Sequence, residues 1–337
     1  MRPFRFGVNY PRGALETWLD HCRTAEQQGY DAVHAPDHLG SAAPFAMLAA
    51  AAAVTERVKL GTYVLNNSFW NPHLLAREAA TVDLLSGGRV ELGLGLGYVR
   101  SEFETAGIPW QPHAERVDRL AATIDVLTQV FSGAGPQPLP EPRPCPPLMI
   151  GGHNDRLLTL AARTCDVVAF SGALARKDGP PGALRLVPAD EVQARVDLVR
   201  KEAGDRLDDV EFASLIQYVE ISDDAERTAA ELVERFGDDS LNTPERILAN
   251  PFIKIGTAAE LTDEVVRDRH RFGFTYLITH GQHRDALAEV IAVHRDFALT
   301  DARTAEINRR RATPTSDMVP VEDMTHLLDE RSANEQS

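Results

Sequence analysis

The sequence predicts a (β/α)₈ barrel, the TIM-barrel class of α/β fold. Short β-type runs alternate with helical runs along most of the chain, glycine or proline marks many of the boundaries, and the alternation yields eight strand–helix units. A chain of 337 residues suits one such barrel. In this class, functional side chains gather at the carboxyl ends of the strands.

The first half of the chain supplies four of these units. Apolar and β-branched runs predict strands at 4–9, 31–35, 58–65 and 90–94. Helical spacing predicts the first helix, from Leu15, Trp18, Leu19, Cys22 and Ala25, and Gly29 is placed to end it. An alanine-rich helix follows at 44–54. Asn71 and Pro72 begin a helix to Leu85 as N-cap and first residue, and an amphipathic helix spans 117–131.

The second half repeats the pattern with longer insertions. Strands are predicted at 148–150, 166–170, 211–220 and 276–279. Helices are predicted to end near Arg163, to span 190–203, to begin at Ser222, to run from a Thr257–Glu260 capping box to Phe272, and to span 284–297. Segments 99–114, 171–188 and 237–253 are predicted loops at the carboxyl ends, the second a mobile excursion. We expect one domain over 1–300 and a loosely ordered polar tail over 301–337.

The composition limits the classes of partner. Lys+Arg 35 against Asp+Glu 50 gives a net charge of −15, which argues against nucleic acid. No apolar run is long enough to span a bilayer, and the amino terminus has no signal-peptide core, so we expect no membrane association and a cytoplasmic location. The three cysteines show no metal spacing, and we expect no metal site. An anionic ligand would need local positive charge.

The glycine-rich run at 93–97 leaves a second fold open. An open doubly wound sheet would also give strand–helix alternation. Gly93, Gly95 and Gly97 are spaced G-x-G-x-G, however, and not G-x-G-x-x-G as dinucleotide-binding sheets require. The barrel is therefore the favoured prediction.

The ordered motifs from Arg5 to Phe297 resemble those of the bacterial luciferase-like monooxygenase superfamily. They are Gly29-Tyr30-Asp31 with Asp37-His38, the run Arg57 to Thr62, the run Asn71 to Ala76, the run Leu84 to Gly97, the run Pro147 to Gly152, and Asp166-Val167-Val168. Within that superfamily the sequence is most similar to the branch that uses the deazaflavin coenzyme F420, where a helix start of the type seen at 154–158 is common. Some relatives use FMN instead.

The resemblance implies a barrel that holds a flat, isoalloxazine-like ring at the carboxyl ends of its strands. It also implies a non-proline cis peptide bond between Tyr63 and Val64, where the third strand meets the ring. Asp37 and His38 would lie against the ring. His38 would be a proton donor or an anchor, because imidazole titrates near neutral pH. Without the resemblance, His38 would more simply close a loop.

Each remaining candidate has a functional and a structural interpretation. Asn66 would bind the edge of the ring or, like Asn67, form a turn. Gly95 and Gly97 would let the ring approach the backbone or make a tight turn. Tyr98 stands where the deazaflavin-dependent sugar-phosphate dehydrogenases have a glutamate, their proposed proton donor. That difference argues against sugar phosphates, and Tyr98 would either replace the donor or shape the pocket.

Gly151, Gly152, His153 and Asn154 open the helix after the fifth strand. Free amides and the helix dipole make an anion site there, and the resemblance assigns it to the cofactor phosphate. His153 and Arg156 would add positive charge, although Arg156 would serve equally as a solvated helix residue. His280, at the end of the eighth strand, is a weaker candidate on the substrate side, and Arg77 and Glu78 are expected on a helix surface or interface.

These residues lead to three hypotheses. The first is an F420-dependent oxidoreductase that transfers a hydride between the reduced deazaflavin and an electron-poor C=C or C=N bond, with His38 or Tyr98 as proton donor. The second is an FMNH₂-dependent monooxygenase fed by a separate reductase. The third is a flavin-binding protein without turnover. The substrate would be a small or specialised metabolite or a modified peptide, and the resemblance implies a homodimer formed through the helices after strands two and three.

Overall fold

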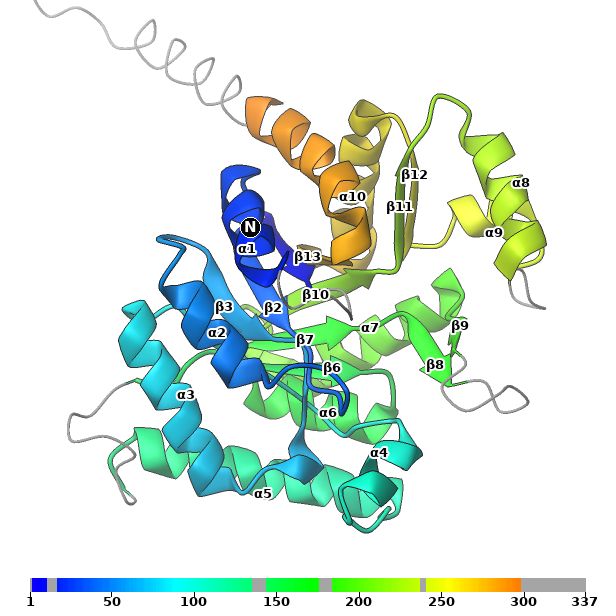
Figure 1. The fold of residues 1–337 in the computed structure, drawn as a ribbon. Coiled ribbons are helices and arrows are strands. Elements are labelled where there is room, and N and C mark those ends of the chain that lie inside the picture. The colour runs from blue at the N-terminus through cyan, green and yellow to red at the C-terminus, as the bar shows by residue number, and fades with distance from the viewer. Residues whose placement is uncertain (1, 11–16, 135–143, 176–183, 237–240, 298–337) are drawn as a thin grey trace, which may run out of the picture. The chain divides into compact units, whose positions relative to one another are not determined.

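The computed structural model describes residues 2–10, 17–134, 144–175, 184–236 and 241–297. Contacts divide the chain into two units, 1–293 and 294–337. The predicted tail at 301–337 lies outside the described residues, as do 176–183 of the predicted mobile excursion. The first unit contains all the elements below, which Figure 1 labels.

In the described part of the chain, eight parallel strands close into a barrel, so the predicted fold class is confirmed. The strands are β1 (Arg5–Asn9), β2 (Ala32–Ala35), β3 (Lys59–Thr62), β5 (Val90–Gly95), β6 (Leu148–Gly152), β7 (Val167–Phe170), β10 (Glu211–Ile216) and β13 (Phe274–His280). β3 pairs with β2 on one side and with β5 on the other, and β1 pairs with β13, so the ring of strands has no open edge.

The third predicted strand, 58–65, is interrupted. β3 ends at Thr62, a cis peptide bond joins Tyr63 to Val64, and β4 (Leu65–Asn66) resumes pairing with β5. The non-proline cis peptide bond implied by the resemblance is therefore confirmed at the expected residues.

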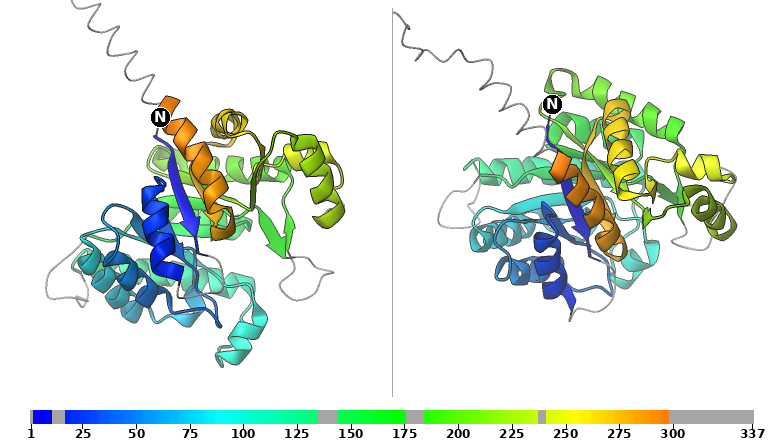
Figure 2. Two further views of the ribbon diagram at one scale, coloured as in Figure 1. Left: turned by 45° about the horizontal axis from the view of Figure 1, so that its top comes forward. Right: turned by 90° about the horizontal axis from the view of Figure 1, so that it is seen from above.

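The helices cover the outside of the barrel, as the two views in Figure 2 show. They include α1 (Trp18–Gln27), α2 (Pro44–Ala52), α3 (Pro72–Ser86), α5 (His113–Phe131), α6 (Asp155–Thr164), α7 (Ala189–Ala203) and α10 (Ala258–Phe272), and a last helix begins at residue 284. The predicted caps are confirmed. The Asn71 side chain accepts from the amides of His73 and Leu74, and Thr257 and Glu260 form the capping box of α10.

Three departures from the prediction lie at the carboxyl ends of the strands. Segment 99–114 contains a short helix, α4 (Arg100–Thr105), and the excursion contains a hairpin of β8 (Ala173–Ala175) and β9 (Leu184–Leu186). The predicted strand 211–220 is two strands, because β11 (Tyr218–Ile221) leaves the barrel and pairs with β12 (Ile253–Gly256). Between them lie α8 (Ala225–Phe236) and α9 (Pro244–Leu248), the latter in a segment predicted to be irregular. These pieces are too short for a readable periodicity.

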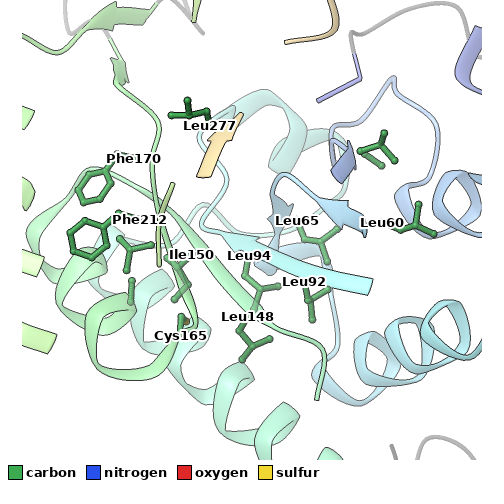
Figure 3. Packing of buried hydrophobic residues seen from close by; sticks show 14 of the residues in the cluster. Leu60, Leu65, Leu92, Leu94, Leu148, Ile150, Cys165, Phe170, Phe212 and Leu277 are labelled. Carbon is green, nitrogen blue, oxygen red and sulfur yellow. The ribbon is translucent and has the colours of Figure 1, made fainter. Parts of the chain in front are cut away.

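Apolar side chains alternate between two cores. Leu92, Leu94, Leu148 and Ile150 face outward into the layer between strands and helices, where Figure 3 shows them packed. Their neighbours along the strands face into the barrel, where Met149, Ala169, Leu215 and Ile278 form a smaller cluster with Tyr63 and Tyr276. No helix in the described segments is long and apolar enough to cross a membrane.

Charged side chains fill the amino-terminal end of the barrel. Arg5 binds two buried carboxylates: it contacts Glu91 and lies 2.7 Å from Glu211. The hydroxyl of Tyr276 donates to Glu91 at 3.1 Å and lies 3.0 Å from Nε2 of His34. This network joins β1, β2, β5, β10 and β13, far along the strands from the ends where function is expected.

Two buried histidines make stability depend on pH. Burial and a nearby arginine lower the pKa of His21 to about 4 and that of His34 to about 3. In the unfolded chain each takes up its proton near pH 6.5, so the stability they contribute is present above that pH and is lost as pH falls toward the folded pKa. We expect the free energy of unfolding to fall between pH 6.5 and 5 by up to about 1.4 kcal/mol per pH unit for each histidine. Urea unfolding at several pH values measures this free energy. His21→Phe should reduce its dependence on pH, and a free energy that does not change with pH in the wild type would contradict the prediction.

Candidate functional site

The end of β2 carries a histidine–carboxylate pair. Nδ1 of His38 lies 2.9 Å from Oε1 of Glu102, which α4 supplies, and both side chains are mostly buried. The ring of Tyr98 meets the His38 ring edge-on, with 5.6 Å between centroids. The carboxylate favours the tautomer with the proton on Nδ1, which leaves Nε2 for a substrate. The structure thus brings both predicted catalytic residues together and adds Glu102.

Asp37 supports the neighbouring strand end. Its Oδ2 accepts from the amide of Asn66 at 3.0 Å and from the indole of Trp70 at 2.9 Å. Burial raises the pKa of Asp37, and these two hydrogen bonds oppose that rise. The carboxylate therefore fixes the segment after the cis peptide bond against the end of β2, and so helps to place Asn66 and Val64.

Asn66 has the predicted turn role, and its other side-chain atom is left without a partner in the described residues. Its Oδ1 accepts from the amide of Ser68 at 3.2 Å, which makes it the turn residue that caps a short 3₁₀ helix, η2 (Asn67–Phe69). Its Nδ2 is buried and has no partner among the described residues. Gly97 has a φ of +68° and lies directly against the Asn66 amide, so a side chain at 97 would displace it. Gly97 is therefore a turn glycine whose missing side chain also leaves the space that the Asn66 amide occupies.

The Val64 side chain lies close to the backbone of the two neighbouring strands, which accounts for the glycines at positions 95 and 151. A Cβ on Gly95 would lie 2.5 Å from Cγ2 of Val64, and one on Gly151 would lie 3.2 Å from Cγ1. These glycines therefore first make room for Val64. Tyr63 lies below, 7% exposed, with its ring edge against His34. Val64 and Tyr63 therefore place apolar side chains beside the ends of β5 and β6.

The start of α6 has the features of an anion site. Asn154 caps the helix through the amide of Arg156 at 3.0 Å, and Gly152 leaves the space that Leu157 fills. His153 is 7% exposed, and its Nε2 is buried without a partner in the described chain. Burial lowers the pKa of His153 to about 4, with further lowering by Arg195 and Arg185. His153 therefore stays neutral, and Nε2 is available for a ligand.

The positive charge near this helix start comes from residues other than the two predicted, His153, which is neutral, and Arg156. Arg156 is exposed and pairs with Asp118 at 2.5 Å, so it is a solvated helix residue. Arg195 of α7 instead lies 3.2 Å from Asp155, the first residue of α6. Arg185 of β9 lies farther along the same side and is 3.7 Å from Glu191. Neither arginine could be assigned to this site from the sequence, since both come from segments distant in the chain.

His280 lies on the opposite side of the mouth. Its Nε2 donates to Oε1 of Gln217 at 3.1 Å, and Gln217 donates to the carbonyl of Ser171 at 2.7 Å. Burial lowers the pKa of His280 to about 4. This chain joins the ends of β13, β10 and β7, so His280 lines the mouth as a neutral side chain. Arg77 and Glu78 pair with each other on the surface of α3.

Some of the buried polar atoms without partners lie at or just beyond the strand ends. In the described residues they include Oδ1 of Asn9 after β1, Nδ2 of Asn66, both side-chain polar atoms of Asn67, and Nε2 of His153. Leaving such a group unsatisfied costs about 1–3 kcal/mol, so a cluster of them is a sign of a ligand. Together with the apolar side chain of Val64, they fit a planar ring with carbonyl and amide groups on its edge, joined to an anionic group at α6.

A closed barrel with a histidine–carboxylate pair and unpaired polar atoms at its mouth is the arrangement of a TIM-barrel enzyme. The chain belongs to the luciferase-like monooxygenase family, whose model matches residues 2–300.

The relatives by sequence include a reductase and a dehydrogenase, and the name of the dehydrogenase specifies F420. The chain is 28% identical over 293 residues to a 5,10-methylenetetrahydromethanopterin reductase of Archaeoglobus fulgidus, covering 78% of this chain and 84% of that one. It is 38% identical over 125 residues to an F420-dependent glucose-6-phosphate dehydrogenase of Intrasporangium calvum, covering 34% of this chain. That match spans only 37% of the dehydrogenase.

Solved structures share the fold at low identity. An F420-dependent secondary alcohol dehydrogenase bound to an F420–acetone adduct aligns with a TM-score of 0.68 and 18% identity, over 87% of this chain and 99% of that one. A long-chain alkane monooxygenase aligns with a TM-score of 0.62 and 14% identity, over 83% of this chain and 87% of that one. At these identities the likeness establishes the barrel.

Proposed function

We propose that the protein is an F420-dependent oxidoreductase that transfers a hydride between the reduced deazaflavin and an electron-poor C=C or C=N bond. The observation that carries the proposal is the His38–Glu102 pair, 2.9 Å apart, at the rim of the mouth lined with unsatisfied polar atoms. The named activities of the sequence relatives support the choice of cofactor.

The residues that would hold the cofactor come from four strand ends. Val64, with Gly95 and Gly151 behind it, would support the ring face, and the amides of Asn66 and Asn67 would bind its polar edge. The start of α6, with His153 and Arg195, would hold its phosphate. When bound, the deazaflavin supplies the hydride at ring carbon five.

His38 would move the proton that accompanies the hydride. Glu102 binds Nδ1 and orients the ring, so Nε2 is the nitrogen that can deliver a proton to the atom next to the one that receives the hydride. In the reverse direction the same nitrogen takes the proton back from the amine nitrogen or the carbon that it had protonated. Tyr98, which is 51% exposed beside His38, is the second candidate donor. A small or specialised metabolite, or a peptide with a dehydro residue or cyclic imine, is the substrate class we propose.

A binding titration with oxidised F420, and in parallel with FMN, tests the proposal. Micromolar or tighter binding of F420 alone supports it, and anaerobic reduction of imines and enones would follow. Preference for FMN would overturn it and favour a two-component FMNH₂ monooxygenase. The structural likeness to the alkane monooxygenase is the reason to test this second function. A requirement for oxygen distinguishes the monooxygenase from the F420-dependent oxidoreductase.

We predict that Arg195→Gln weakens F420 binding by about tenfold, the loss of one charge-assisted contact. Arg195 lies at the start of α6 beside Asp155, where the phosphate would bind. Arg156→Gln is the matched control, because Arg156 lies in the first turn of α6, one residue after Asp155, but pairs with Asp118 at the surface. Isothermal titration of F420 into each variant measures the change in affinity. Equal loss of affinity in both variants would mean a general effect of charge and would contradict the prediction.

We also propose that the protein is a homodimer and that it resides in the cytoplasm. Leu74, Leu84 and Leu85 on α3 are 49%, 51% and 62% exposed, an unusual apolar surface for one helix. Leu85→Glu should therefore convert the dimer to a monomer in sedimentation velocity, since it buries a charge in the interface. Leu207→Glu, at an exposed site outside α3, should leave the dimer intact. A wild-type monomer would contradict the proposal.

A further inference from the structure

Arg116 is a buried cation, and no carboxylate in the described chain pairs with it. The residue is 7% exposed and lies near the start of α5. Its Nη1 donates to the carbonyl oxygens of Leu96 at 3.1 Å and Gly97 at 2.6 Å. The guanidinium also lies 4.0 Å from the ring centroid of Trp110 and 5.8 Å from that of Phe103. A guanidinium can bind carbonyls with its edge and aromatic rings with its faces at once.

The partners of Arg116 lie on both sides of Glu102 in the chain. Leu96 and Gly97 follow β5 in the short segment that leads to α4, and Phe103 follows Glu102 directly. Phe103 is fully buried, with Trp110 edge-on at 4.8 Å and Phe69 at 5.5 Å. Arg116 therefore contacts the segment that enters α4 and the buried side chain next to Glu102.

α4 needs such contacts. It has six residues, and its N-cap, Val99, makes no side-chain hydrogen bond. An isolated helix of that length is unstable in water, so tertiary contacts must set its position. Glu102 in turn must reach His38, which another strand end supplies, at hydrogen-bond distance.

We propose that Arg116 is a positioning residue that holds Glu102 against His38. The bonds to the Leu96 and Gly97 carbonyls fix where the chain leaves β5, and the stacked rings fix how α4 is turned. Without the guanidinium, α4 would shift, and the carboxylate would lose its contact with Nδ1. The role in catalysis rests on the proposed function, whereas the effect on the His38 ring does not.

The first test uses the protein without cofactor. Nitrogen-15 NMR of labelled histidine reports which nitrogen of neutral His38 carries the proton. Wild type should carry it on Nδ1, and Glu102→Ala and Arg116→Met should both shift it to Nε2. Arg100→Met is the control, since Arg100 lies on α4 but pairs with Glu104 at the surface. A wild-type tautomer in folded Arg116→Met would overturn the proposal.

Arg116→Lys is a second variant that tests the same contact if Arg116→Met does not fold. Lysine keeps a donor for one carbonyl but loses the flat faces for the rings, so this variant should show a mixture of tautomers. If Arg116→Met does not fold, the lysine variant decides: a pure wild-type tautomer there overturns the proposal.

The second test is a double-mutant cycle on kcat. Arg116→Met and Glu102→Ala should each lower kcat by about tenfold, and the double variant by about tenfold as well, because the two act through one contact. A hundredfold loss in the double variant would show independent effects and overturn the coupling. If the protein lacks F420 activity, the proposed function fails while the tautomer result still stands.

Discussion

Replacing His38 by Gln is expected to lower kcat by about a hundredfold, because a positioned general acid contributes about 10²–10⁴ in rate. Glutamine can still bond Glu102, whose Oε1 lies 2.9 Å from the native Nδ1, but it cannot deliver a proton at neutral pH. The dissociation constant for F420 should change little, so the loss should appear in kcat. Single-turnover reduction measured by deazaflavin absorbance checks it.

Two further variants show whether the proton comes from His38. His73→Gln changes an exposed histidine at the start of α3 and should retain full activity. Tyr98→Phe keeps the ring that packs edge-on against His38 and removes only the hydroxyl. If Tyr98→Phe loses a hundredfold while His38→Gln loses less than threefold, Tyr98 is the donor and the assignment of His38 is wrong.

Arg5→Met is expected to destabilise the protein by about 3–5 kcal/mol, the usual cost of removing one partner from a buried ionic group. Arg5 is shared by Glu91 and Glu211, whose side chains are 6% and 5% exposed. Methionine would fill much of the volume but leave two carboxylates facing each other inside the barrel. Chemical denaturation at pH 7 measures the change in the free energy of unfolding.

A surface arginine provides the comparison. Arg23 pairs with Asp20 at 2.9 Å, with side chains 47% and 81% exposed, and Arg23→Met should cost less than about 1 kcal/mol. Adding Glu91→Gln to Arg5→Met should recover part of the loss, since it removes one uncompensated charge. Similar small losses for Arg5→Met and Arg23→Met would show that the network at the base of the barrel contributes little.

Local sequence was enough for the regular parts of the barrel. Asn71 before Pro72, and Thr257 before Glu260, fix helix starts through side-chain bonds to amides within three residues, so the printed sequence contains the whole interaction. α4 and β12 were missed because neither six nor four residues complete a periodic pattern. β11 was merged with β10 because both runs are apolar and only Gln217 separates them.

The residues of the candidate site also fall into a group that the sequence predicted and a group that it did not. His38, Asn66, Tyr98 and the glycines around them follow strands, and the end of a strand can be located in a sequence. Glu102, Arg116 and Arg195 come from helices, and each contacts a residue at the barrel mouth that is at least 19 positions away in the chain. Their pairing exists only once the barrel closes.

The sequence by itself determined the eight strand–helix units, the family resemblance and the strand ends where polar residues gather, because these depend on neighbours along the chain. Only the tertiary structure decided which carboxylate meets His38, which arginine lies at the start of α6, and that Gly95 and Gly151 make room for Val64. These contacts depend on distances between residues far apart in the chain, and those distances are set when the strands, including the β3–β5 pair, form the closed ring.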